Sequence, residues 1–160
     1  MKTYPYLVSL LLLAALINEN AVQWALAVNV GGYSLAAGCH NAFTYFSLLG
    51  YLFFTAFRLV PYLVLGGVLV ALSKTRFKDY IPAVFAGGLA GILAMIIWGS
   101  WVTLRPLYTG AHVSSTTAIA FLFIPIYAIP AGAIGALLFA ALYTPLRNLF
   151  RTHSPMTNDQ

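Results

Sequence analysis

Four long apolar segments, separated by short polar ones, run along the chain. The clearest extends from Phe43 to Ser73 and contains one charged residue, Arg58, near its middle. A helix that crosses a bilayer needs about 20 mostly apolar residues, each adding about 1.5 Å of length. The pattern therefore predicts an all-α integral membrane protein. We expect a single four-transmembrane-helix bundle over 1–146 with short loops, spans at about 4–28, 43–73, 80–104 and 116–146, and a polar tail over 147–160.

The first apolar segment also resembles the core of a secretory signal peptide, because the run from Leu7 to Ile17 follows a lone basic residue, Lys2. A cleavage site of the Ala-x-Ala kind would place Glu19 where a small neutral side chain is required. We therefore expect a true first helix with a polar interruption at Asn18-Glu19-Asn20. Removal of this segment as a signal peptide is the alternative, and it would leave the orientation of the other spans unchanged.

Composition excludes a soluble globular protein. Hydrophobic residues make up 61% of the chain and charged residues 7%, whereas soluble domains carry about 25% charged residues. The mean hydropathy is +0.88. The net charge of +5 does not indicate nucleic-acid binding, because the basic residues form short clusters beside apolar runs. The single cysteine, Cys39, excludes a disulfide within the chain.

The basic clusters predict the orientation of the spans. Lys74, Arg76 and Lys78 form the strongest cluster, between the second and third spans. Cytoplasmic loops carry an excess of Lys and Arg, so this loop is expected in the cytoplasm. Four spans then place the N- and C-termini on the same side, and only Arg105 lies in the loops of the other side. We expect the chain in the cell (inner) membrane with cytoplasmic termini.

Polar residues of the first two spans fall at one depth. Glu19 lies 14 residues, or about 21 Å, from Pro5, and Arg58 lies 15 residues, or about 22 Å, from Ser73. A charge at the bilayer centre is costly without a partner, and Glu19 is the one carboxylate within reach of Arg58. We expect an intramembrane polar seam centred on this ion pair. Its expected members, placed by helical spacing, are Glu19, Gln23, Tyr51, Thr55, Arg58 and Tyr62.

Three roles for the polar seam remain open. It can fix the register of the helices, as buried polar pairs do in other proteins. It can line a small cavity for water or a solute, because ionisable residues inside membranes often mark ion or substrate pathways. It can also pair with a helix of another protein.

Small residues recur at every fourth position in the third and fourth spans. Such faces let helices approach closely in lipid, where association depends on packing and hydrogen bonds. We expect the third and fourth helices to pack through the following residues: Gly87 and Gly91, preceded by Ala83, on one side and Ala128, Gly132, Ala136 and Ala140 on the other.

The sequence contains no recognisable catalytic or cofactor motif. His40, Cys39 and His112 lie in the connections, but their spacing specifies no metal site. Hydrolase, zinc-protease and phosphate-loop signatures are absent, and the loops opposite the basic clusters contain no acid. We therefore expect no metal, no cofactor and no enzyme activity.

Two functions from different classes fit these features. The first is a non-enzymatic accessory, assembly or regulatory subunit that packs against other membrane proteins. The second is a small oligomeric transporter or channel-like protein that uses the Glu19 and Arg58 seam. The expected partners are the lipid bilayer and either another membrane protein or further copies of the chain, without nucleic acid.

Overall fold

The computed structural model describes residues 3–44, 46–110 and 117–152, and these residues form helices and turns with no strand. The helices are α1 (Tyr4–Leu16), α2 (Glu19–Asn29), α3 (Leu35–Phe43), α4 (Leu48–Ser73), the 3-10 turn η1 (Lys78–Tyr80), α5 (Ile81–Leu104), α6 (Pro106–Thr109) and α7 (Thr117–Thr152). The prediction of an all-helical chain is confirmed for this part of the protein.

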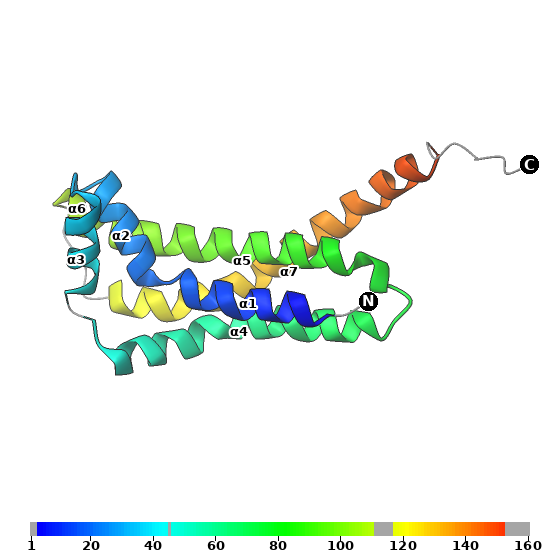
Figure 1. Cartoon of the computed structure of the whole chain (residues 1–160), viewed down its shortest axis with the longest axis horizontal. Helices are drawn as coiled ribbons and strands as arrows, with labels where there is room; N and C mark the ends of the chain where they lie inside the picture. The colour runs from blue at the N-terminus through cyan, green and yellow to red at the C-terminus, as the bar shows by residue number, and fades with distance from the viewer. Residues whose placement is uncertain (1–2, 45, 111–116, 153–160) are drawn as a thin grey trace, which may run out of the picture.

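The long helices α4, α5 and α7 lie side by side with α1 (Figure 1). The most extensive packing is between α5 and α7, and α4 packs against α1, α5 and α7. The short helices α2, α3 and α6 gather at one end of the bundle. The start of α1, the α4–α5 connection and the end of α7 lie toward the other end, which we call the basic end after Lys74, Arg76 and Lys78.

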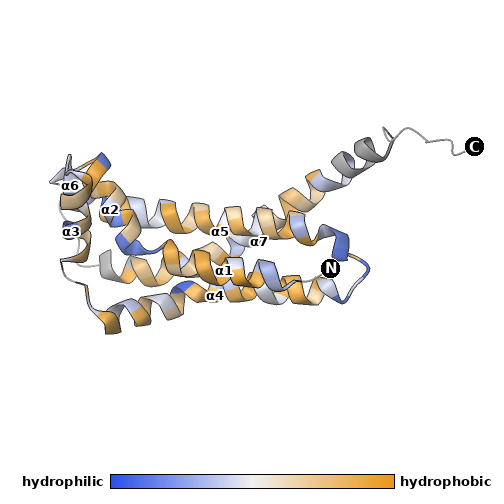
Figure 2. Ribbon diagram, in the orientation of Figure 1, coloured by the Kyte–Doolittle hydropathy of each residue, from blue (hydrophilic) through white to orange (hydrophobic). Residues whose placement is uncertain are grey.

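Within the described residues, three helical segments are long and apolar enough to cross a membrane: Leu48–Ser73, Lys78–Thr109 and Phe121–Pro145. A fourth candidate is the bent pair formed by α1 and α2. Many large apolar side chains are exposed. Hydrophilic residues gather at the ends of the bundle, at the start of α2 and at one place within α4 (Figure 2). These features are those of a membrane protein.

The first span differs from the unbroken helix predicted over 4–28. The chain bends by 53° between α1 and α2. Ile17 is extended, and the Asn18 side chain caps α2 by accepting a hydrogen bond from the Ala21 N–H at 2.9 Å. Asparagine favours this capping position over a helix interior. The polar interruption noted in the sequence is therefore a helix break.

Three further boundaries differ from the predictions. The connection between the first two spans contains α3, which begins after the Ser34 cap. The second long helix begins at Leu48 rather than 43, because the Ser47 hydroxyl accepts from the Gly50 N–H. The last helix continues to Thr152, so the predicted polar tail over 147–160 begins as helix. The segments 111–116 and 153–160 lie outside the described residues.

Candidate functional site

The structure brings Glu19 and Arg58 together where α1, α2 and α4 meet. The two side chains form an ion pair, in which Arg58 is 4% exposed and Glu19 is 23% exposed. The guanidinium of Arg58 also donates to the Thr55 hydroxyl at 2.9 Å and to the Ala14 carbonyl at 3.1 Å. Every nitrogen of the guanidinium therefore has a protein acceptor.

Arg58 and its neighbours satisfy two of the carbonyl groups that the helix break leaves free. The last carbonyls of a helix have no partner within it, and in an apolar environment each unsatisfied group is costly. The Ala14 carbonyl accepts from Arg58, while the Ala15 carbonyl accepts from the Tyr51 hydroxyl at 3.2 Å and the Asn18 amide at 3.1 Å. Two residues of α4 thus close the end of α1.

The two charges also match the electrostatics of the break. Arg58 lies at the C-terminus of α1, where the helix dipole is negative, and Glu19 is the first residue of α2, where it is positive. The pair therefore joins α1 and α2 to each other as well as to α4. Sequence reasoning predicted a contact between two continuous helices and missed this role in bridging a break.

The predicted members of the polar seam do not all take part. Thr55 and Tyr51 contact Arg58, the latter with its ring centroid 5.8 Å from the guanidinium carbon. The side chain of Gln23 forms no hydrogen bond with any residue that the structure describes. Tyr62 is 2% exposed and its hydroxyl is buried without a hydrogen-bond partner in the described part of the chain. Tyr62 follows Arg58 by one helical turn, as its spacing predicted, but its ring packs in the apolar core and its hydroxyl forms no hydrogen bond with the pair.

A cavity of about 20 Å³ adjoins the ion pair. Besides Glu19 and Arg58, its lining includes the hydroxyl-bearing Ser100 of α5, which is 4% exposed. This volume can accommodate one water molecule and no larger solute. Sequence reasoning missed Ser100, although its spacing from Ile92 and Ile96 places it on the buried face of α5.

Glycines set the contact between α5 and α7. A Cβ atom added to Gly87 would meet the carbonyl oxygen of Gly135, and one added to Gly91 would meet that of Ala131. The backbones are therefore in direct contact, and Gly135 and Ala131 were missed by the sequence pattern. Of the predicted α7 residues, Ala128 and Gly132 are buried between the helices, while Ala136 and Ala140 line an apolar groove beside α4.

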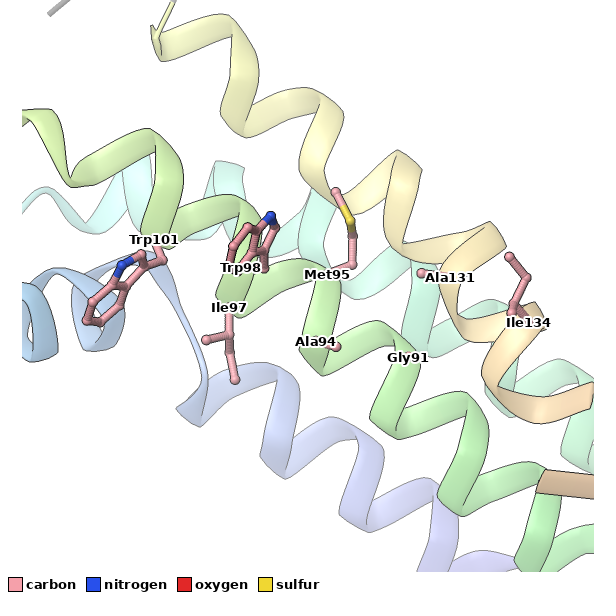
Figure 3. A pocket seen from close by; sticks show the side chains of 8 residues that line it. All are labelled: Gly91, Ala94, Met95, Ile97, Trp98, Trp101, Ala131 and Ile134. Carbon is pink, nitrogen blue, oxygen red and sulfur yellow. The ribbon is translucent and has the colours of Figure 1, made fainter. Parts of the chain in front are cut away.

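A larger groove lies on the flank of the α5–α7 contact (Figure 3). It has a volume of about 770 Å³ and an almost entirely apolar lining. The residues that line it are Gly91, Ala94, Met95, Ile97, Trp98 and Trp101 from α5 and Ala131 and Ile134 from α7. We call this the α5–α7 groove.

Among the described residues, no group of three or more His, Cys, Asp or Glu side chains is arranged to hold a metal ion. Cys39 and His40 are exposed on α3, and His112 lies outside the described residues. The strongest chemical feature of the described chain is therefore the ion pair at the helix break. Comparison with protein-family models, with curated protein sequences and with solved structures finds no match to this chain.

Proposed function

We propose that the chain is an integral protein of the cell (inner) membrane with four spans, the bent α1–α2 pair forming the first. The two halves of that pair contain 13 and 11 residues, or about 36 Å of helix, and the 53° bend between them shortens their end-to-end reach to about 32 Å, which still spans a hydrocarbon core of about 30 Å. The basic end contains Lys74, Arg76 and Lys78, and the start of α1 and the end of α7 lie toward the same end. The excess of basic residues supports a cytoplasmic location for this end.

We further propose that the protein is a non-enzymatic accessory, assembly or regulatory subunit that packs against another membrane protein. The observation that carries this proposal is the closed geometry of the polar seam. The guanidinium of Arg58 is engaged by acceptors of the same chain, and the adjoining cavity holds a single water at most. The pair is therefore suited to holding helices together. Glu19 is engaged by Arg58, which leaves its carboxylate poorly placed to act as a general base.

The outer surface has exposed apolar side chains that could contact another membrane protein. Large apolar side chains are exposed on different helices, including Phe53 on α4 and Leu138 on α7, which are 52% and 59% exposed. Cross-linking from these positions in native membranes tests the proposal. A photo-reactive residue at Phe53 or Leu138 is expected to capture one defined membrane protein, whereas the fully buried Leu69 serves as a control that captures none.

A small oligomeric transporter is the second candidate, and the helix break favours it. Transporters often bind anions at the N-terminus of a broken helix and cations at its free carbonyls. In this chain Glu19 and Arg58 occupy those two positions. Flux of a solute or of protons through vesicles containing only the purified chain, lost in Arg58→Leu but retained in the surface variant Gly67→Ala, would favour transport over the accessory role.

A further inference from the structure

The α5–α7 groove extends from the middle of the bundle toward the end opposite the basic end. Gly91 and Trp101 mark its extent along α5, ten residues or about 15 Å apart. Figure 3 shows the two tryptophans on α5 beyond Met95, with Ala131 and Ile134 on α7 at the other part of the groove. Trp98 is 68% exposed. In a membrane protein, tryptophans near the end of a span lie at the level of the lipid headgroups.

The dimensions of the groove favour a hydrocarbon chain over a protein helix. A 15 Å length of helix with a diameter of about 10 Å occupies on the order of 1,200 Å³. The groove has about 770 Å³ and is open along its flank, so a helix would not seat within it. A flexible acyl chain is narrower, and the apolar lining suits it.

The charge beyond the groove favours an anionic headgroup. Arg105 follows Trp98 by seven residues, close to two helical turns, so both residues lie on one face of the α5–α6 segment. Its side chain is exposed and forms no ion pair with a described residue. Of the three acids in the chain, Glu19 is paired with Arg58, Asp79 lies at the basic end, and Asp159 lies outside the described residues, seven positions after the end of α7.

We propose that the α5–α7 groove binds one acyl chain of an anionic phospholipid, with the lipid phosphate at Arg105. The guanidinium is a geometric match for phosphate oxygens. Trp98 and Trp101 lie nearer the middle of the bundle than Arg105, at the expected level of the lipid ester groups. Their indole N–H groups have no hydrogen-bond partner among the described residues and can donate to those esters. This inference rests on the proposed membrane location and is independent of any protein partner.

Native mass spectrometry of the purified chain in detergent tests the site. The chain is titrated with phosphatidylglycerol or with phosphatidylcholine that carries the same acyl chains. We expect tighter binding of phosphatidylglycerol, and Arg105→Gln should lower that affinity about fivefold and leave phosphatidylcholine binding unchanged. Arg76→Gln, which changes an exposed arginine beside Phe77 at the basic end, is the matched control and should have no effect on this site.

A second pair of variants tests the groove itself. Ala94→Phe should fill the groove and weaken both lipids, whereas Ala86→Phe, at an exposed α5 position outside the lining, should weaken neither. Helix content measured by circular dichroism checks that each variant is folded. Phosphatidylglycerol binding that survives both Arg105→Gln and Ala94→Phe would overturn the proposal. A dimer that Ala94→Phe dissociates would overturn it in favour of a second copy as the occupant.

The lipid titration and the cross-linking experiment together separate this inference from the proposed function. Equal binding of the two lipids by the wild-type chain, with a partner still captured by cross-linking, would overturn the lipid site alone. Selective lipid binding without any partner would overturn the accessory role alone.

Discussion

At the scale of single residues, Arg58 is notable because one guanidinium serves the end of α1, the start of α2 and a hydroxyl of α4. Lysine would not replace it, because a single ammonium lacks the planar arrangement of donors that reaches three separate acceptors. A buried ion pair need not stabilise a fold more than apolar residues would. Its value here is that it also satisfies a free carbonyl group.

Replacing Arg58 should therefore be more costly than the loss of one ion pair suggests. Arg58→Leu leaves the Glu19 carboxylate and the Ala14 carbonyl without their donor, and we expect it to lower the free energy of unfolding by about 3 to 5 kcal/mol. The double variant Glu19→Leu/Arg58→Leu should cost less than the sum of the single changes, because no lone charge remains buried. Thermal unfolding in detergent measures both, and additive costs would contradict the coupling.

Two tyrosines of the predicted polar seam should respond differently to loss of the hydroxyl. Tyr62→Phe removes a buried hydroxyl that has no partner in the described structure, so we expect unchanged or higher stability. Tyr51→Phe removes the hydrogen bond to the Ala15 carbonyl and should cost about 1 kcal/mol. Thermal midpoints of the two variants provide the comparison. A clear loss of stability in Tyr62→Phe would indicate a partner for the hydroxyl.

At the scale of elements, the α1–α2 break depends on Asn18. Its side chain accepts from the Ala21 N–H and donates to the Ala15 carbonyl, so it completes the ends of both helices. We expect Asn18→Ala to cost about 1 kcal/mol or more, as the loss of a helix cap does elsewhere, and to speed amide hydrogen exchange at Ala21. Asn18→Ser keeps a capping oxygen and should retain most of the exchange protection. Equal exchange in the two variants would rule out a capping role.

The α5–α7 contact depends on the absence of side chains. Gly87→Ala would force the two backbones apart, because the added Cβ meets the Gly135 carbonyl, and should destabilise by about 1 to 3 kcal/mol. Gly67 of α4 is the matched control, since an added Cβ meets nothing within 4 Å there. Gly67→Ala should stabilise by about 0.5 to 1 kcal/mol through its higher helix propensity. If both variants unfold at the same temperature, close packing at Gly87 does not limit stability.

Whether the sequence predicts an element boundary depends on whether local hydropathy or a contact with another helix determines that boundary. The third span was expected over 80–104 and α5 covers Ile81–Leu104, because an unbroken apolar run ends at charged residues on both sides. The break at Ile17 was not predicted, since it depends on Arg58 and Tyr51 reaching from α4 to satisfy its carbonyls. Hydropathy along one segment contains no information about donors on another.

The groups near the candidate site were predictable to different degrees. Charge scarcity identified Glu19 and Arg58, because three acids leave few pairings to consider. Ser100 was missed because a single serine in an apolar helix gives no signal until the other helices enclose it. The face of α7 that contacts α5 includes Gly135, which the predicted stripe did not contain. A spacing of four residues identifies a stripe along a helix but does not specify how the helix is rotated against its neighbour.

At the scale of the whole molecule, labelling of the natural cysteine tests the proposed orientation in the membrane. Cys39 is exposed on α3, at the end of the bundle opposite the basic end. A membrane-impermeant maleimide added to intact cells should label it. In a Cys39→Ala background, Thr75→Cys in the α4–α5 connection should be labelled only after the membrane is opened. The reverse pattern would invert the proposed topology.

The helix break also has a consequence for membrane insertion during synthesis. Glu19 is synthesised 39 residues before Arg58, which at 5 to 20 residues per second is an interval of about 2 to 8 seconds. During that interval the Glu19 carboxylate and the Ala14 carbonyl at the end of α1 lack the donors that Arg58 later provides. The first span is therefore expected to settle in the membrane only after α4 has emerged. Glycosylation mapping of nascent chains should find it unstably inserted when synthesis stops at residue 50 and stably inserted once α4 is complete.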